Sequence, residues 1–474
     1  MLSQIPLAQL SEILACTPLN LSDDALATPT TGITTDTRSV KPGEVFVALR
    51  GEKFDGHDFV NRAAEKGAIA AITSRQLPEP VPQLLVADTL QAYQAIARWW
   101  RDKFNIPVIA VTGSVGKTTT KELIAAVLST QGNVLKTQAN YNNEIGVPKT
   151  LLELGTEHDY AVIEMGMRAR GEIALLTQIA RPTISVITNV GTAHIGRLGS
   201  EEAIATAKCE LLAEMPPTGV AILNYDNRLL IETAAKVWQG QTVTVSISLA
   251  DLSRAAAPKS NTVAHLVGDY VVQPKENGDE AQTLLVEGYQ LPLPLPGRHN
   301  ALNYLAALAV AKILQVDWQP LTAGLVVNLP SGRAQRYDLP NDVVILDETY
   351  NAGLESMLAA LHLLAQTPGK RHIAVLGTMK ELGERSPEFH QQVGETARQL
   401  NLDALLVLVD DPEAEAIATG AAGMPVECFS THAALVERLQ EVVRAGDRLL
   451  FKASHSVGLD RVVNQFRSEF PSSD

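Results

Sequence analysis

The chain has 474 residues, of which 46% are hydrophobic and 19% charged, a composition typical of globular domains. At about 150 residues per domain, this length predicts three domains rather than one. The 39 basic and 53 acidic residues give a net charge of −14, which excludes nucleic acid as an expected partner, because a body of this sign repels a phosphate backbone.

The cysteines and the N-terminus indicate the compartment. Cys16, Cys209 and Cys428 lie far apart and lack the paired spacing of a zinc site, so we expect a reducing, cytoplasmic environment. Residues 1–20 contain neither a basic leader nor a long apolar run, so we expect neither export nor membrane insertion. We also expect a monomer.

The first part of the chain predicts a small α/β domain. Residues 32–73 alternate short apolar runs with turn signals, and a Pro-rich segment at 77–83 precedes another short strand. A helix follows, with an apolar face formed by Tyr93, Ile96, Ala97 and Trp100. We therefore place the N-terminal domain at residues 1–90.

Apolar strands separated by helices follow, at residues 106–113, 160–166 and 183–190. This alternation predicts a parallel sheet covered by helices. A β-rich insert at 241–295 should interrupt the sheet, with a hairpin turn at 275–280. A helix then leads to the breaker cluster at 328–332, which suggests a central domain at residues 91–327.

The remaining residues, 328–474, contain four further apolar strands between helical stretches. They predict a third domain with a doubly wound, Rossmann-like sheet. The strands are expected at residues 343–349, 372–377, 404–410 and 448–454. The predicted fold class is thus α/β throughout, in three domains.

The segment AVTGSVGKTTT joins a strongly apolar strand to a helical segment. Gly113 and Gly116 permit a tight turn whose N–H groups face phosphate oxygens, and the helix N-terminus adds partial positive charge. Lys117 would then contact the β- and γ-phosphates, and Thr118 would offer a hydroxyl to Mg²⁺. Val111 replaces the first glycine of the usual GxxxxGK[ST] pattern, so a turn without a ligand is the alternative. ATP binding is the favoured prediction.

Mg²⁺ on a triphosphate needs further oxygen ligands, which gather at the carboxyl ends of parallel strands. Glu164 ends one strand there, although an acidic residue in that position is often only surface decoration. His194 follows another strand, where its imidazole would bind a metal or a phosphate, or serve a structural role. Lys208 lies in a helical segment, where a lysine is ordinarily solvated.

Several motifs, in this order along nearly the whole chain, resemble those of the Mur ligase family, whose members are ATP-dependent amide-forming enzymes of peptidoglycan precursor synthesis. The motifs are TGSVGKTTTKE, NYNNEIGVP, TNVGTAHIGRLGS, IATAKCE, LPGRHNALNYLAAL and SGRAQRYDL. Residues 34–60 are similar to an N-terminal uridine-nucleotide domain shared by the tripeptide-forming branch and the branch that adds D-alanyl-D-alanine. Residues 346–361 and 376–390 resemble the latter branch, which adds D-alanyl-D-alanine to a UDP-N-acetylmuramoyl tripeptide through an acyl phosphate. The resemblance implies an N-terminal uridine-nucleotide domain, a central P-loop ATPase domain and a C-terminal ligase domain, with these two small molecules, ATP and Mg²⁺ as ligands.

The resemblance also implies roles for individual residues. The implied catalytic residues are Lys117, His194 and Lys208, and the implied metal ligands are Thr118, Glu164, His194 and Lys208, the last as a carbamate. The implied ATP-binding residues are Gly113, Ser114, Val115, Gly116, Lys117, Thr118, Thr119, Asn300, Asn303, Arg333, Asp347 and Glu348. The implied substrate-binding residues are Thr35, Asp36, Arg38, Asn140, Asn142, Asn143, Tyr350 and Asn351.

The chain departs from the family pattern at two places. Glu348 stands where the family tends to have Asp, which keeps the charge but moves the carboxylate by a methylene. His455 stands where the family has Arg, and its smaller, not always charged side chain is a poorer phosphate clamp.

Four other functions remain as alternatives to the dipeptide-adding ligase. They are a sibling ligase that adds one amino acid, a folate polyglutamylating enzyme, a P-loop kinase or NTPase, and a non-catalytic nucleotide-binding module.

Overall fold

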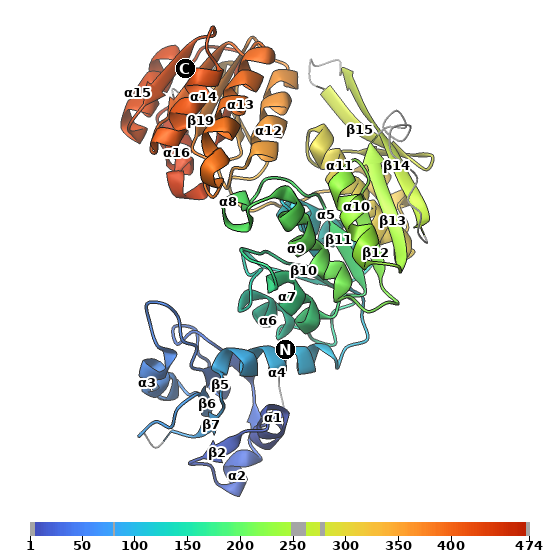
Figure 1. Cartoon of the computed structure of the whole chain (residues 1–474), viewed down its shortest axis with the longest axis vertical. Coiled ribbons are helices and arrows are strands. Elements are labelled where there is room, and N and C mark those ends of the chain that lie inside the picture. The colour runs from blue at the N-terminus through green and yellow to red at the C-terminus, as the bar shows by residue number, and fades with distance from the viewer. Residues whose placement is uncertain (1–4, 79–80, 248–261, 275–279, 471–474) are drawn as a thin grey trace.

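The computed structural model describes residues 5–78, 81–247, 262–274 and 280–470. Three α/β units follow one another along an elongated molecule, with the N-terminal unit (blue) at one end and the C-terminal unit (red) at the other (Figure 1). The expected three-unit α/β architecture is confirmed. Within the described residues, no helix combines the length and the apolar character needed to cross a membrane.

The N-terminal unit contains a five-stranded sheet in which only the edge strand β2 is antiparallel to its neighbour. In spatial order its strands are β2 (Thr17–Leu19), β7 (Gln83–Leu85), β6 (Ala70–Thr73), β5 (Glu44–Val47) and β4 (Gly32–Thr34). The strands β1 (Ile5–Pro6) and β3 (Pro29–Thr30) form a separate small ladder, and the helices are α1 (Leu7–Leu14), α2 (Asp23–Leu26) and α3 (Val60–Glu65).

Helix α4 (Thr89–Arg101) joins the N-terminal and central units. It begins at Asp88, whose side chain accepts hydrogen bonds from the amides of Leu90 (2.8 Å) and Gln91 (3.0 Å) and so caps the helix. The helix contacts α1 of the N-terminal unit and α6 and α7 of the central unit. A boundary between residues 90 and 91 would therefore fall inside one continuous helix.

The central unit is built on a nine-stranded sheet. In spatial order its strands are β16 (Tyr289–Pro292), β15 (Glu280–Val286), β14 (Thr262–Pro274), β13 (Gln241–Ile247), β12 (Val220–Asn224), β11 (Ile184–Ile187), β8 (Val108–Thr112), β10 (Tyr160–Glu164) and β9 (Val134–Lys136). Its helices are α5 (Lys117–Leu128), α6 (Gly146–Leu151), α7 (Glu172–Ala180), α8 (Ile195–Leu198), α9 (Glu201–Ala213), α10 (Arg228–Val237) and α11 (Arg298–Ile313). The strands from β14 to β9 run parallel to one another, whereas β15 and β16 are antiparallel.

The expectation that residues 241–295 interrupt this sheet is wrong. Strand β13 pairs in parallel with β12, and β14 pairs in parallel with β13, so the segment extends the sheet. The physical reason is that β12 alone would expose an edge of unpaired backbone groups, which β13 satisfies. The expected hairpin is present in the antiparallel pair of β14 and β15, but its tip at 275–279 lies outside the described residues.

Alternate residues of each central strand face different helical layers. In β8, Val108 and Ala110 pack into the layer that contains α4, α6, α7 and α9, whereas Ile109 and Val111 pack against α5 and α11. This follows from the two-residue period of a strand, and it explains why the sequence of a fully covered parallel strand is continuously apolar. The two layers hold the C-terminal ends of β8, β10 and β11 at one edge of the sheet.

The C-terminal unit has a six-stranded sheet with helices on both faces, as expected. In spatial order its strands are β17 (Gln335–Leu339), β18 (Val343–Asp347), β22 (Asp447–Lys452), β19 (Arg371–Gly377), β20 (Ala404–Leu408) and β21 (Val426–Phe429). Helices α15 (His432–Val442) and α16 (Leu459–Glu469) cover one face, and α12 (Leu354–Gln366), α13 (Ser386–Gln399) and α14 (Glu415–Gly420) cover the other. Only β17, at the edge, runs antiparallel.

Candidate active site

The loop between β8 and α5 has room for glycine alone at two positions. Gly113 has φ +153°, and a Cβ there would lie 1.9 Å from the hydroxyl of Thr188. Gly116 has φ +81°, a left-handed conformation that disfavours other residues, and a Cβ there would lie 2.8 Å from Oδ1 of Asn303. Val111 is fully buried inside β8, so the tight turn begins two residues after it and needs no glycine at that position.

A second loop, residues 188–194 after β11, braces the first. The amide of Val115 donates to Oδ1 of Asn189 (3.0 Å), and the hydroxyl of Thr188 donates to the carbonyl of Val115 (2.6 Å). The amide of Ser114 donates to the carbonyl of Asn189 (3.1 Å). The path of the phosphate-type loop is thus held by side chains from the neighbouring strand end. The sequence motif includes Asn189, but its spacing alone did not single that residue out.

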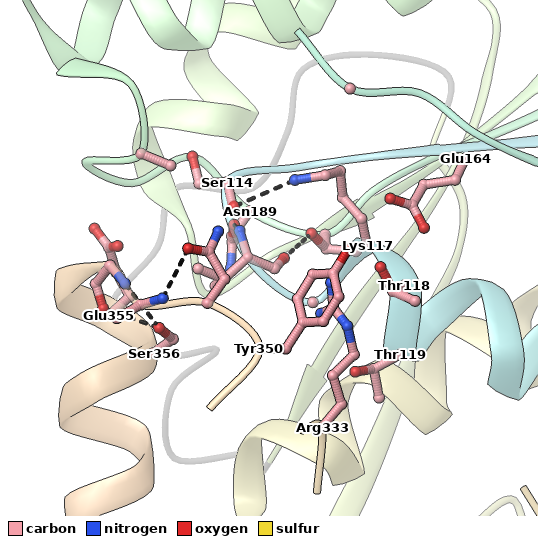
Figure 2. A pocket seen from close by; sticks show the side chains of 18 of the residues that line it. Ser114, Lys117, Thr118, Thr119, Glu164, Asn189, Arg333, Tyr350, Glu355 and Ser356 are labelled. Atoms are coloured by element: carbon pink, nitrogen blue, oxygen red, sulfur yellow. Dashed lines mark hydrogen bonds between the residues drawn. The ribbon is translucent and has the colours of Figure 1, made fainter. Parts of the chain in front are cut away.

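Lys117, the first residue of α5, lies back over its own loop. Its ammonium donates to the carbonyls of Gly113 (2.9 Å) and Ser114 (3.4 Å), and Figure 2 shows the bond to Ser114. Burial lowers the pKa of Lys117, Glu164 acts to raise it, and Arg333 lowers it further. The amine therefore lies at the loop rather than in solvent. A polyanion bound at the loop would contact it there.

These loops open into a cavity of about 590 Å³ lined by the central and C-terminal units. This volume is in the ordinary range for small-molecule sites. Figure 2 shows Lys117, Thr118 and Thr119 on one side, with Arg333 and Tyr350 beside them and Glu355 and Ser356 entering from another helix. Most of the expected site residues line this one cavity: Ser114, Val115, Gly116, Lys117, Thr118, Thr119, Asn140, Asn142, Asn143, Glu164, His194, Lys208, Asn300, Asn303, Arg333, Glu348, Tyr350 and Asn351.

Asp347, in contrast, does not line the cavity. Its carboxylate is 3% exposed and accepts hydrogen bonds from the amide (3.0 Å) and hydroxyl (2.6 Å) of Thr349, and burial raises its pKa. Glu348 does line the cavity, where its Oε1 accepts from the amide of Ala334 (3.1 Å). The two neighbouring acidic residues therefore have different roles. The carboxylate of Asp347 stabilises a turn, and Glu348 lines the cavity.

Three of the expected substrate residues lie outside the cavity, in the N-terminal unit. Thr35, Asp36 and Arg38 follow β4. The guanidinium of Arg38 donates to both oxygens of Asp36 at 2.7–3.0 Å, and these bonds lower the pKa of Asp36 to about 2. The pair is solvent-exposed and lies apart from the cavity.

Glu164, at the end of β10, uses only one of its two carboxylate oxygens in a hydrogen bond with the described residues. The side-chain amide of Asn142 donates to its Oε1 (2.8 Å), and the hydroxyl of Thr137 accepts from its backbone amide (2.9 Å). Its Oε2 is buried and has no hydrogen-bond partner in the described part of the chain. A buried carboxylate oxygen without a donor is costly unless a cation or another donor reaches it.

Lys208, on α9, is 2% exposed, so the expectation of an ordinary solvated lysine is wrong. The helix turns this position toward the cavity, which a sequence without a clear apolar stripe does not reveal. Over residues 5–78, 81–247, 262–274 and 280–470, no hydrogen bond or ion pair satisfies its amine. Burial sets its pKa well below the usual range, and the charge of Lys117 lowers it further. The lowered pKa increases the fraction of uncharged, nucleophilic amine at a given pH.

The C-terminal unit contributes a stack of side chains. The guanidinium of Arg333 lies 3.8 Å from the ring centre of Tyr350, whose other neighbour is the His455 ring at 5.6 Å and an interplanar angle of 29°. Across the cavity, the hydroxyl of Thr120 donates to Oδ1 of Asn303 (3.2 Å), and the amide of Asn303 donates to Oδ1 of Asn300 (3.3 Å). The side chains around the loop are thus held by one another before any ligand binds.

Four further residues of this region were not predicted. Glu355 on α12 accepts from the amide (2.6 Å) and hydroxyl (3.3 Å) of Thr192, and Glu381 bonds to His194 Nδ1 (2.5 Å). His299 and Lys452 line the cavity, and burial lowers the pKa of His299 to about 4. Glu355, Glu381 and Lys452 come from the C-terminal unit, so only tertiary structure reveals their contact with the central loops.

An Asp–His–Ser chain in the N-terminal unit is structural. His57 Nδ1 lies 2.5 Å from Asp55, and the hydroxyl of Ser74 lies 3.2 Å from His57 Nε2. However, the backbone amide of Ser74 already donates to that same Nε2 (2.9 Å). The lone pair that a general base would use is therefore occupied, and the chain fixes a turn.

Comparison with known proteins decides the family. The model of the Mur ligase middle domain matches residues 111–311, that of the Mur ligase glutamate ligase domain matches 332–455, and that of the Mur ligase family catalytic domain matches 29–100. The chain belongs to the Mur ligase family. These matches confirm the resemblance seen in the motifs.

Individual Mur ligases match over nearly their whole length. A Synechocystis protein named UDP-N-acetylmuramoyl-tripeptide–D-alanyl-D-alanine ligase is 57% identical over 457 residues, covering 96% of this chain and 95% of its own. The Escherichia coli protein of the same name is 39% identical, with coverage of 91% and 92%. Crystal structures of MurF from Acinetobacter baumannii (TM-score 0.86, 30% identity, covering 99% and 100%) and, with ADP, from Thermotoga maritima (TM-score 0.79, 30% identity, 95% and 99%) share this fold.

Proposed function

We propose that this Mur ligase joins D-alanyl-D-alanine to UDP-N-acetylmuramoyl-tripeptide, with conversion of ATP to ADP and phosphate. The names of its relatives support this reaction, because 57% and 39% identity extend over almost the full chains. The observation that carries the proposal is the single cavity in which the glycine loop and Lys117 meet Arg333 and Glu348 of the C-terminal unit. The Thermotoga maritima relative binds ADP, which supports nucleotide binding in this cavity.

The chemistry follows from the poor reactivity of a carboxylate toward an amine. A terminal carboxylate oxygen of the tripeptide attacks the γ-phosphorus of ATP, the bond to the β–γ bridging oxygen breaks, and ADP leaves. The amine of D-alanyl-D-alanine attacks the resulting acyl phosphate at its carbonyl carbon and gives up a proton, and inorganic phosphate leaves. The protein aligns the groups and neutralises charge, which is the main contribution of a protein to phosphoryl transfer.

Residues of both units would share the binding of ATP in this scheme. The Lys117 ammonium and the amides at the start of α5 would face the phosphates, and Asn300 and Asn303 lie at the start of α11 beside the loop. Arg333, over the Tyr350 ring, supplies a second fixed cation. Asp347 would act indirectly, because its carboxylate is used by Thr349.

The donor set also fits Mg²⁺. The buried, unpartnered Oε2 of Glu164 and the hydroxyl of Thr118 are hard oxygen donors near the loop, and His194 lines the same cavity. Among the described residues, no group of three or more His, Cys, Asp or Glu side chains is arranged to hold a metal, so the remaining ligands would be phosphate oxygens, water or a carbamate. When bound, Mg²⁺ would supply charge neutralisation to the triphosphate.

The lowered pKa of Lys208 supports its carbamylation, because it increases the fraction of uncharged amine. An uncharged amine adds to the carbon of carbon dioxide and releases one proton, and the product carries a carboxylate-like group in place of the cationic form. This change would remove the cost of a buried ammonium and add an oxygen donor beside Lys117. Without it, two lysines share a cavity at mutual electrostatic cost.

The UDP-muramoyl substrate would extend from this cavity to the N-terminal unit. Asn140, Asn142 and Asn143 line its central-unit wall and would face the muramoyl peptide, together with Tyr350 and Asn351. The exposed Asp36–Arg38 pair, with Thr35, would face the uridine diphosphate. We propose the domain limits 1–90, 91–327 and 328–474, the first of which falls within the connecting helix α4. We also propose that the protein acts as a monomer in the cytoplasm, where its three free cysteines would stay reduced.

The test is ADP release measured with each substrate omitted in turn. Release should require ATP, the UDP-muramoyl tripeptide and D-alanyl-D-alanine, and single amino acids should not replace the dipeptide. Lys117→Ala should lower turnover by about 10²- to 10³-fold or more with an unchanged melting temperature. Lys236→Ala, an exposed lysine on α10, is the matched control. Equal release without the dipeptide, or an active Lys117→Ala protein, would contradict the proposal.

A further inference from the structure

His194 is held by a residue of a different unit. The residue lies at the start of α8, with φ +66°, and its ring lines the cavity. Its Nδ1 lies 2.5 Å from Oε2 of Glu381, which belongs to the turn after β19 in the C-terminal unit. The contact joins side chains 187 positions apart in sequence.

Both oxygens of Glu381 are occupied. While Oε2 faces His194, Oε1 accepts from Nε (3.2 Å) and Nη2 (2.9 Å) of Arg197, one turn along α8. The carboxylate therefore has a fixed orientation. Because a carboxylate only accepts hydrogen bonds, His194 must donate its Nδ1 proton, and in the neutral imidazole this leaves Nε2 with a free lone pair.

The backbone around this contact is shaped to permit it. The amide of Gly196 donates to the carbonyl of Glu381 (3.1 Å), and a Cβ added to Gly196 would lie 2.6 Å from the amide nitrogen of Gly383. Glu381 itself has φ +66°, a conformation that costs a non-glycine residue free energy. Two strained residues, His194 and Glu381, thus meet across a close backbone approach, a combination that persists only when the surroundings favour it.

We propose that Glu381 is a positioning residue that orients the imidazole of His194 toward the cavity with Nε2 unprotonated. Because the two side chains belong to different units, this orientation forms only while the C-terminal unit contacts the central unit. Glu381 thereby links the placement of the C-terminal unit to the state of one site residue. The inference rests on the proposed function only for the role of His194 in turnover.

Two readouts test the proposal on the full-length protein. The first is the ¹⁵N spectrum of histidine-labelled protein at about pH 8, where imidazoles are mostly neutral. The His194 signals, assigned by their loss in His194→Asn, should report an Nδ1–H tautomer in the wild type. In Glu381→Ala the Nε2–H form, which free imidazole side chains prefer, should predominate. An unchanged tautomer would overturn the proposal.

The second readout is kinetic. Glu381→Ala should lower kcat about 10- to 100-fold with little change in KM, and Glu381→Gln, which keeps an acceptor but no charge, should fall between it and the wild type. Glu384 is an exposed neighbour whose side chain forms no hydrogen bond or ion pair within the described part of the chain, so Glu384→Gln should equal the wild type. In a His194→Asn background, Glu381→Ala should cause no further loss, since coupled residues are not additive.

A wild-type kcat in Glu381→Ala, or an equal fractional loss in the His194→Asn background, would show that Glu381 does not act through His194. The proposed function fails separately, if the wild type does not release ADP with both substrates. In that case the ¹⁵N tautomer still decides the positioning role.

Discussion

Burial is the main cause of the lowered pKa of two basic side chains at the cavity. Lys208 is 2% exposed, and its pKa is lowered by burial and by Lys117. His299 lies at the start of α11, where burial and Lys452 lower its pKa. Both therefore reduce the stability of the folded protein at pH values where the unfolded chain would bind a proton.

Lys208→Met should stabilise the protein and abolish turnover. Methionine fills a similar volume without a buried amine, so the folded state should gain about 1–3 kcal/mol near neutral pH. In the unfolded chain, Lys208 binds a proton whenever the pH is below the usual pKa of lysine. The gain in stability should therefore shrink as the pH rises toward that pKa. Melting temperatures of the unmodified proteins check both statements, and a lower melting temperature for Lys208→Met would contradict them.

His299 should make the protein acid-sensitive. Its pKa of about 4 in the folded state lies below the usual 6.5, so the unfolded state binds the extra proton, and stability falls as the pH drops through this window. The full shift corresponds to at most about 3 kcal/mol, less because the side chain is half-buried. Between about pH 7 and about pH 4.5, the melting temperature should therefore fall less for His299→Gln than for the wild type. An equal fall in both proteins would show that His299 does not cause the acid sensitivity.

At the scale of elements, the loop after β11 connects the phosphate-type loop to the C-terminal unit. One side of it bonds to Ser114 and Val115 through Asn189, and the other bonds to Glu355 through Thr192. The geometry of the nucleotide site therefore depends on side chains of a neighbouring loop as well as on the glycine loop itself.

Asn189→Ala should weaken nucleotide binding. The change removes the acceptor of the Val115 amide and leaves that N–H free to turn away from the loop axis. A lost hydrogen bond of this kind is worth about 0.5–1.5 kcal/mol, so the Kd for a non-hydrolysable ATP analogue should rise about 2- to 12-fold. Calorimetric titration measures the change, with Asn61→Ala in the N-terminal unit as the control. An unchanged Kd would show that the loop holds its shape without Asn189.

The sequence could predict the elements whose signal is local. The strands around residues 106–113, 160–166 and 183–190 are continuously apolar because helices cover both faces, and the structure confirms them. The segment 241–295 was misinterpreted because period and turn signals identify a strand but not the edge it joins. Residues such as Glu355 and Glu381 were missed because their partners lie 163 and 187 positions away.

At the scale of the whole molecule, the distribution of charge explains how an acidic protein would bind anionic substrates. The net charge is −14, yet Lys117, Arg333 and Lys452 line one cavity between the central and C-terminal units. The exposed Asp36–Arg38 pair belongs to the unit at the far end of the elongated chain (Figure 1). A long substrate, with a nucleotide at one end and a carboxylate at the other, suits this separation.

The most direct test of the central claim follows oxygen atoms. The UDP-muramoyl tripeptide is supplied with ¹⁸O in its terminal carboxylate, and the inorganic phosphate formed with ATP and D-alanyl-D-alanine is analysed by mass spectrometry. If the carboxylate is activated as an acyl phosphate, each phosphate released should carry one ¹⁸O atom. Phosphate free of ¹⁸O would show that ATP is hydrolysed by water and would contradict the account.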